Sequence, residues 1–222
     1  MAVHQATGDS GDVMIVAALA VACLQCATAT PVSVPAADEP ATRCDVVVTI
    51  PEIVVREELR HYPGSPDDGR GTRIQNTGDL ASPLGRKGGV RAGEVGNFFI
   101  AGHRTSAGGP LLHLRQLRRG DIVKVRTSCG DGVDITHTYA ITGKPEYIDF
   151  FTRKGRAAQI APVPLQPGEM PSQPMVTLST CATQEDRARG DRRLDRFGNP
   201  PGRWVAVGVL TGLTSPAPAD RG

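Results

Sequence analysis

The sequence predicts a mainly β fold in a single domain. Short apolar runs rich in Val, Ile and Thr recur along the chain, and glycine- and proline-rich stretches separate them. The length of 222 residues fits one domain, and contents of 39% hydrophobic and 22% charged residues are ordinary for a chain that buries a core. A net charge of +2, with no basic stripe interleaved with aromatic residues, argues against nucleic-acid binding.

Residues 13–29 form the longest apolar run and precede the predicted β domain. At 17 residues the run is at the lower limit for a membrane span, and it lacks the preceding Lys or Arg that an anchor or secretion signal favours. The alternatives are a signal-anchor, a cleaved signal with its cut near residues 27–31, a lipobox at residues 19–23, and a buried helix. We expect a signal or membrane anchor over residues 1–29 and an extended linker over residues 30–44.

The β domain is expected over residues 45–212, followed by a C-terminal tail at residues 213–222. The composition of residues 63–93 predicts a long glycine-rich connection. The composition of residues 143–174 predicts a second connection, which is irregular and partly proline-rich. Residues 111–117 suit a short helix in which Leu111, Leu114 and Leu117 share one face. The strands are predicted, in order, at residues 46–50, 53–55, 96–103, 122–127, 133–142, 175–181 and 202–210.

Three of these strands carry a chemically distinctive residue at one end. One strand ends in Cys181, another ends in His103, and the last begins with Arg203. A reactive cysteine needs one group that takes its proton and another that holds the negative charge developing on the substrate, and histidine and arginine can supply them. Strand alternation places Arg203 in one row with three valines, at the rim of the face expected to point to the core.

Four ordered motifs resemble those of the sortases, the cysteine transpeptidases of Gram-positive cell surfaces. The Thr-Leu-Ser-Thr-Cys at residues 177–181 is similar to the sortase TLxTC motif, and the Ile-Pro-Glu-Ile at residues 50–53 resembles the entry to the first sortase strand. Residues 93–104 resemble the segment from Gly-Asn to Gly-His-Arg, and residues 117–125 resemble the turn and strand that follow it. The Gly-His-Arg at residues 102–104, the Leu-Ser-Thr-Cys at residues 178–181 and the alanine- and arginine-rich composition are most similar to class E sortases of actinobacteria. The resemblance implies an eight-stranded sortase-like β-barrel with one or two short helices.

The resemblance also implies roles for the three strand-end residues. Cys181 would be the nucleophile, His103 the general acid and base, and Arg203 the group that binds the oxyanion or orients the substrate. Thr180, Thr105 and Ser106 are candidates for substrate binding, although the first could equally pack inward and the others are common loop residues. The alternatives without catalysis are that Cys181 is a buried structural cysteine and that His103 is a hydrogen-bonded histidine at a strand end.

Two departures from the sortase pattern leave rival residues open. The gap between Cys181 and Arg203 is longer than usual in sortases and contains further arginines, of which Arg196 is the main rival, in a segment expected to be a solvated charged loop. The His-x-Pro-Gly segment of many sortases is absent ahead of residue 93, and His61 and His113 are rivals to His103 that match no motif.

The expected activity is cleavage of an LPxTG- or LAxTG-like sorting signal between Thr and Gly through a cysteine thioacyl intermediate. The acyl chain would pass to an amine, expected on a peptidoglycan precursor, with the protein held at the membrane by its N-terminus on the extracytoplasmic face. A pilin-polymerising sortase and a non-catalytic extracytoplasmic binding domain are the alternatives. A papain-like peptidase is disfavoured because His103 precedes Cys181 in the chain.

The remaining cysteines predict neither a redox motif nor a metal site. Cys44 and Cys129 could form a disulfide in an oxidising compartment and leave Cys181 free. No cofactor or metal is expected, and no acidic cluster calls for calcium.

Overall fold

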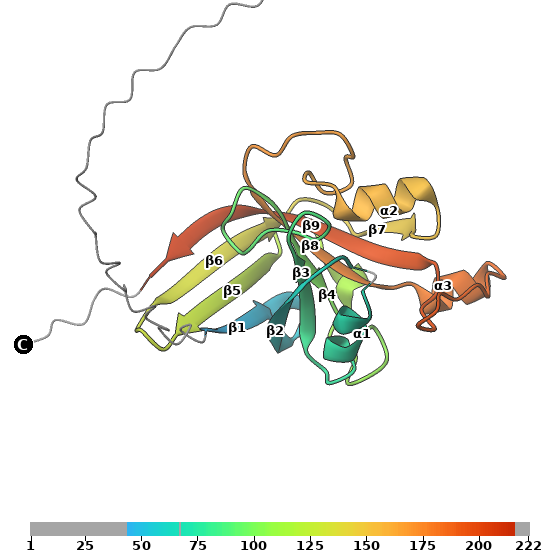
Figure 1. Cartoon of the computed structure of the whole chain (residues 1–222), viewed down its shortest axis with the longest axis horizontal. Helices are drawn as coiled ribbons and strands as arrows, with labels where there is room; N and C mark the ends of the chain where they lie inside the picture. The colour runs from blue at the N-terminus through green and yellow to red at the C-terminus, as the bar shows by residue number, and fades with distance from the viewer. Residues whose placement is uncertain (1–43, 67, 216–222) are drawn as a thin grey trace, which may run out of the picture. The chain divides into compact units, whose positions relative to one another are not determined.

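Nine strands form one continuous sheet in the computed structural model, which describes residues 44–66 and 68–215. Eight of them, in the order β6, β5, β1, β2, β3, β4, β8 and β9, close into a barrel because β6 also pairs with β9 (Figure 1). The ninth strand, β7, pairs with β9 outside this ring. The predicted eight-stranded β-barrel is therefore confirmed. The predicted signal or anchor at residues 1–29 lies outside the described residues, as does the linker up to residue 43.

The strands follow the order expected from the apolar runs, with one shift and two additions. The strand predicted at residues 53–55 was misplaced: Ile53 ends a 3-10 turn, Val54 is left-handed, and β2 begins at Val55 and continues to Pro63. β3 lies within the stretch predicted to be a glycine-rich connection, and β7 lies within the second connection. The last strand also continues past residue 212, the predicted end of the domain. The bounds are β1 (Cys44–Ile50), β2 (Val55–Pro63), β3 (Leu80–Leu84), β4 (Gly96–Ala101), β5 (Ile122–Cys129), β6 (Asp134–Ile141), β7 (Glu146–Asp149), β8 (Pro174–Cys181) and β9 (Gly202–Thr214).

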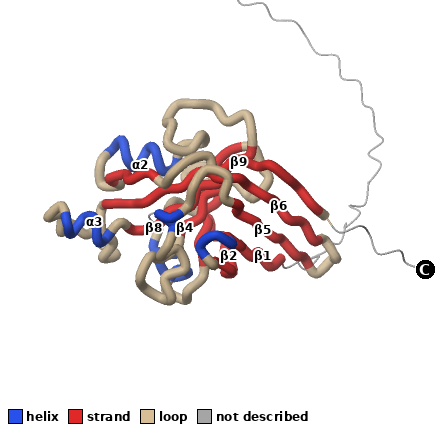
Figure 2. Tube along the Cα trace, turned by 180° about the vertical axis from the view of Figure 1, so that it is seen from behind, coloured by secondary structure: helices blue, strands red, loops and turns tan. Residues whose placement is uncertain are grey.

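The described residues contain three α-helices, where one or two were predicted. They are α1 (Gly69–Gln75), α2 (Arg153–Ile160) and α3 (Thr183–Ala188). Two short 3-10 turns lie at Pro51–Ile53, between β1 and β2, and at Leu114–Gln116, between β4 and β5. The predicted helix at residues 111–117 is thus only a 3-10 turn, although Leu111, Leu114 and Leu117, which were expected to share a face, are all buried. Figure 2 shows α2 and α3 beyond the strands, at one side of the described domain.

Two pairs of strands run parallel, and these bring distant segments together. β2 pairs with β3, and the segment containing α1 makes the return that parallel strands need. β4 pairs with β8 from Gly96 and Pro174 to Ala101 and Ser179, so both strands end at the same edge of the barrel. The segments that follow β4 and β8 therefore lie side by side.

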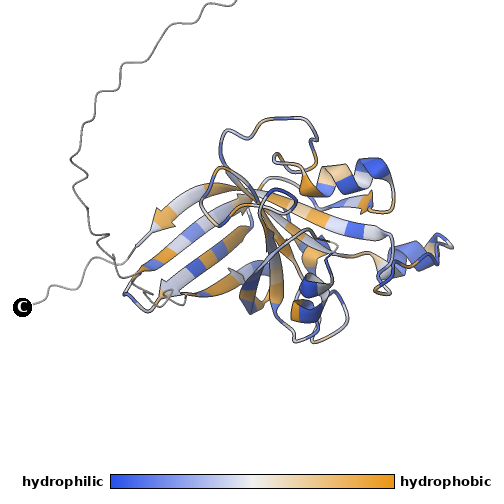
Figure 3. Ribbon diagram, in the orientation of Figure 1, coloured by the Kyte–Doolittle hydropathy of each residue, from blue (hydrophilic) through white to orange (hydrophobic). Residues whose placement is uncertain are grey.

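The barrel is filled from alternate positions of its strands. Val176 and Leu178 of β8 belong to the main hydrophobic cluster, and their neighbours along the strand point to the opposite face. On β9 the cluster takes Ala206, with Trp204 packed against it, so the row that contains Arg203 faces away from this cluster. The expectation that Arg203 stands on the face pointing to the core was wrong. The alternation is visible along β5 and β6 in Figure 3.

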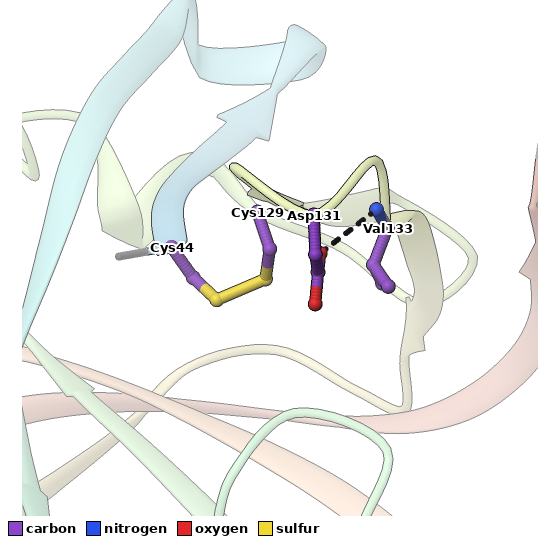
Figure 4. The surroundings of a disulfide bond; sticks show 4 residues. All are labelled: Cys44, Cys129, Asp131 and Val133. Atoms are coloured by element: carbon purple, nitrogen blue, oxygen red, sulfur yellow. Dashed lines mark hydrogen bonds between the residues drawn. A yellow bond between two sulfur atoms is a disulfide. The ribbon is translucent and has the colours of Figure 1, made fainter. Parts of the chain in front are cut away.

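A disulfide joins Cys44 at the start of β1 to Cys129 at the end of β5 (Figure 4). The two cysteines are paired directly across the antiparallel β1 and β5, with 4.0 Å between their Cα atoms. The bond ties the turn end of the β5–β6 hairpin to the start of β1. It also leaves Cys181 as a free thiol.

Among residues 44–66 and 68–215, no helix has the length and apolar character needed to cross a membrane.

Candidate active site

The sheet brings all three predicted catalytic residues to one edge. Cys181 is the last residue of β8, and His103 lies just beyond the end of β4, the parallel neighbour of β8. Arg203 is paired directly opposite Cys181 across the antiparallel β8 and β9. Residues paired in this way project their side chains to the same face, about 5 Å apart at Cβ. The thiol thus has an arginine on one neighbouring strand and a histidine beyond the other.

Cys181 lines two hollows that differ in size and chemistry. The first, which we call the His103 cavity, has a volume of about 440 Å³ and is lined by His103, Cys181 and the segment after β8. The second, the Arg203 cleft, encloses only about 40 Å³ and is lined by Cys181, Arg203, Phe150 and residues of α1 and β8. A substrate bound across the thiol would therefore meet the histidine on one side and the arginine on the other.

His103 is half-buried and is held by a residue that the sequence did not single out. Its Nε2 lies 2.8 Å from Oδ1 of Asn76, the residue that ends α1. If this oxygen is the acceptor, Nε2 carries the proton and Nδ1 stays available. Burial lowers the pKa of His103, which favours the neutral imidazole at neutral pH.

Arg203 is buried, with 9% of its surface exposed, and its guanidinium is fixed by the backbone. Nη1 donates to the carbonyl oxygens of Pro200 and Gly202, the latter at 3.0 Å. The guanidinium also lies over the ring of Phe150, 5.2 Å from its centroid. A cation held in this partly dry cleft is suited to stabilising an oxyanion.

The three predicted substrate-binding residues fall into two groups. Thr180 is buried, lines the Arg203 cleft and donates its hydroxyl to the carbonyl oxygen of Gly102 at 2.8 Å. This bond ties β8 to the residue immediately before His103. Thr105 and Ser106 are exposed and line the His103 cavity.

An ion pair joins the residue after His103 to the helix after Cys181. The guanidinium of Arg104, 8% exposed, binds both carboxylate oxygens of Glu185 on α3 at 2.5 and 3.1 Å. Burial alone would raise the pKa of Glu185, but the hydrogen bond from Arg104 and further polar contacts outweigh it and lower that pKa to about 2. Arg115, whose guanidinium lies over the Trp204 ring, binds the same carboxylate. Glu185 thereby fixes the positions of the two catalytic segments relative to each other.

A second buried carboxylate anchors the start of β9. Asp186 is 1% exposed and accepts hydrogen bonds from the Tyr147 hydroxyl at 2.6 Å and from the Gly202 amide at 2.9 Å. Burial, together with this hydrogen bond, raises the pKa of Tyr147 to about 12. Because Gly202 precedes Arg203, the aspartate fixes the backbone that carries the guanidinium. The sequence placed Asp186 in a solvated charged loop, and this expectation was wrong.

The rival residues lie elsewhere. His61 is in β2 and packs on Phe98, with ring centroids 6.1 Å apart. His113 is exposed and contacts Gln116, and Arg196 lies over the ring of Phe197. None of the three lines the His103 cavity or the Arg203 cleft. In the part of the chain that the structure describes, no group of three or more His, Cys, Asp or Glu residues could hold a metal ion.

A free thiol between a histidine and an arginine, at one edge of a closed β-barrel, defines a cysteine-dependent acyl-transfer enzyme. The chain belongs to the sortase family of cysteine transpeptidases, because the Sortase domain model matches residues 48–197, more than half of its length. Among curated proteins, none matches the sequence.

Solved sortase structures share the fold at low sequence identity. Sortase E from Streptomyces avermitilis is 23% identical, with a TM-score of 0.53 over 78% of this chain and 93% of that one. SrtA sortase from Actinomyces oris is 20% identical, with a TM-score of 0.54 over 82% and 93%. Sortase E1 from Streptomyces coelicolor, solved with a tripeptide in its active site, is 17% identical, with a TM-score of 0.54 over 80% and 95%. These similarities establish the shared fold.

Proposed function

We propose that the protein cleaves an LPxTG- or LAxTG-like sorting signal between Thr and Gly and transfers the acyl chain to an amine of a cell-wall precursor. Cys181 is the nucleophile, His103 the general acid and base, and Arg203 the oxyanion-binding residue. One observation carries the proposal: Cys181 lines both hollows, with His103 in one and Arg203 in the other. A transpeptidase needs this arrangement because the acyl group stays on the thiol while one amine replaces another.

The reaction follows from the state of each group. The neutral imidazole of His103, favoured by its lowered pKa, takes the thiol proton of Cys181. The thiolate attacks the threonine carbonyl carbon, a C–S bond forms, and the guanidinium of Arg203 stabilises the oxyanion. The Thr–Gly C–N bond then breaks, and His103 gives its proton to the leaving amine. In the second half, the incoming amine attacks the thioester, His103 takes its proton, and the thiolate leaves.

The cellular setting is part of the proposal. The protein acts on the extracytoplasmic face, held by an N-terminal anchor or signal, and as a class E sortase, the group to which its motifs are most similar. The disulfide between Cys44 and Cys129 supports an oxidising compartment, because such bonds persist mainly outside the cytosol.

The test incubates the full chain with LPxTG and LAxTG peptides and triglycine as acceptor, and mass spectrometry follows the products and the thioacyl enzyme. We expect a Thr-triglycine product and an adduct on Cys181. Cys181→Ala should abolish both, a loss of at least about 10³-fold. The matched control is Cys44→Ser with Cys129→Ser, which removes two sulfurs and leaves the thiol of Cys181 in place.

Two outcomes would contradict the proposal. A folded protein that yields neither adduct nor cleavage with either peptide would favour the non-catalytic binding domain. A strong preference for a lysine-containing pilin peptide as acceptor would favour the pilin-polymerising alternative.

A further inference from the structure

We propose that the His103 cavity is the acceptor site and that Arg187 and Arg192 select an amine that carries a carboxylate. The inference rests on the proposed function and adds to it the chemical class of the second substrate. Both arginines come from the long segment between β8 and β9, the segment in which this sequence departs from the usual sortase spacing. Figure 3 shows that segment, around α3, as mostly hydrophilic.

The charges that line the cavity leave these two arginines unpaired. Arg104 is bound to Glu185, and Arg193 is bound to Asp191 at 2.6 Å and to Asp149 at 3.0 Å. Asp191 is thus satisfied by Arg193, and Asp186 by the hydrogen bonds from Tyr147 and Gly202.

Arg187 and Arg192 are exposed and form no ion pair with any other residue of the described chain. The cavity therefore presents two free guanidinium groups beside Cys181 and His103. Guanidinium groups bind carboxylates through paired, charge-assisted hydrogen bonds.

The opposite side of the thiol has a different chemistry. The Arg203 cleft is lined by Phe150, Phe197 and neutral polar residues such as Gln75, with Asp195 and Arg203 as its charged members. This lining suits the uncharged peptide backbone of a sorting signal and offers no unpaired arginine from the segment after β8. The two substrates are thus separated by charge: the Arg203 cleft, at about 40 Å³, takes the reacting carbonyl group of the donor, and the acceptor enters the basic cavity.

The cavity is also where the chemistry requires the acceptor. The incoming amine forms a C–N bond to the thioacyl carbon on Cys181 and passes its proton to His103, while the C–S bond breaks and the thiolate leaves. The amine must therefore lie on the side of His103. A chain spans about 3.5 Å per residue, so a carboxylate two or three residues from the amine can reach guanidinium groups across a cavity of about 440 Å³.

The test compares triglycine with triglycinamide as acceptors for the full-length protein. The two amines are chemically alike because the groups that differ lie three residues away. We expect kcat/KM for triglycine to exceed that for triglycinamide about fivefold at low salt, and the preference to shrink at high ionic strength. In Arg187→Gln with Arg192→Gln the ratio should fall to about one. The control is Arg118→Gln with Arg119→Gln, two exposed arginines ahead of β5 that do not line the cavity and should leave the ratio unchanged.

Hydroxylamine, a small neutral acceptor, separates this inference from the proposed function. If the donor is cleaved and transferred to hydroxylamine but the two tripeptides react equally, the acceptor inference is overturned and the transpeptidase stands. If the donor is not cleaved with any acceptor, the proposed function itself fails. An equal loss of hydroxylamine and triglycine transfer in the double variant would also overturn the inference, because selection of a carboxylate should not affect a neutral amine.

Discussion

The two ends of the barrel both depend on cysteine, but they are held together by different means. At one end, Cys44 and Cys129 are joined covalently across β1 and β5. At the other, Cys181 is a free thiol, and hydrogen bonds and an ion pair hold the segments around it: Asn76 binds His103, Glu185 binds Arg104, and Asp186 binds Gly202. Figure 1 shows the β5–β6 hairpin and α3 at opposite ends of the described domain. The contrast indicates that stability at the first end and activity at the second can be changed separately.

Removing the disulfide should have the largest effect on stability and little effect on the site. Cys44→Ser with Cys129→Ser opens a loop with a sequence separation of 85 residues, and this should lower the free energy of unfolding by about 4 kcal/mol. Urea denaturation measures the change, with reduced wild-type protein as the control. Activity per folded molecule should stay near wild type. A large loss of activity in the fully folded variant would show that the two ends are coupled.

Breaking the Arg104–Glu185 pair should affect both stability and activity. Glu185→Ala leaves the buried guanidinium of Arg104 without its carboxylate, which should cost about 3 kcal/mol of unfolding free energy. It should also lower kcat more than it raises KM, because the segments of His103 and Cys181 lose their connection. Arg115→Ala is the matched control, since it removes the exposed partner of the same carboxylate. Equal effects of the two variants would contradict the assignment to the buried pair.

Lowering the pH should destabilise the active-site end of the barrel, because Glu185 becomes protonated and loses its charge. Its pKa is about 2 in the folded protein against an ordinary value of 4.5, so the unfolded chain binds a proton first as the pH falls. The stabilisation is complete above about pH 4.5 and disappears as the pH falls towards 2. Allowing for partial exposure, it amounts to about 1.5 kcal/mol. The difference in unfolding free energy between wild type and Glu185→Gln should shrink over this range, and a constant difference would contradict the prediction.

The smallest effect is expected at Asn76. Asn76→Ala removes the hydrogen bond that orients His103 and should reduce kcat/KM about fivefold, with unfolding free energy nearly unchanged. In the wild type the acid limb of the kcat/KM profile is expected below pH 6.5, because burial lowers the pKa of His103. In Asn76→Ala this limb should shift. Thr77→Ala, at the next position, controls for changes at the end of α1. An unaltered pH profile would show that Asn76 does not act through the imidazole.

Residues with a motif or a strong strand pattern could be predicted from the sequence, and residues placed by long-range packing could not. The runs that end at Cys181 and His103 are apolar and continuous, so their strands and ends were visible. β3 has the sequence Leu-Ala-Ser-Pro-Leu and is buried at nearly every position, so neither alternation nor propensity marked it.

The supporting residues of the site gave no signal of their own. Asn76 follows a glycine-containing stretch and touches His103 only because the return from β2 to β3 passes the end of β4. Asp186 stands in a run of charged residues, and only its contacts with Tyr147 and Gly202 make it a buried group. The role of such residues depends on the residues that they contact in the folded protein, and a single sequence does not reveal those contacts.

The disulfide also determines how the domain carries a mechanical load. A pull on the chain ahead of Cys44 is divided at once between β1 and, through the sulfur bridge, the β5–β6 hairpin. Without the bridge, the same tension would peel β1 away from its two neighbours one pair at a time. With it, β1 cannot separate from β5 unless the bridge itself breaks, so the load is shared with β5, with β6 and, through the pairing of β6 with β9, with the strand that carries Arg203.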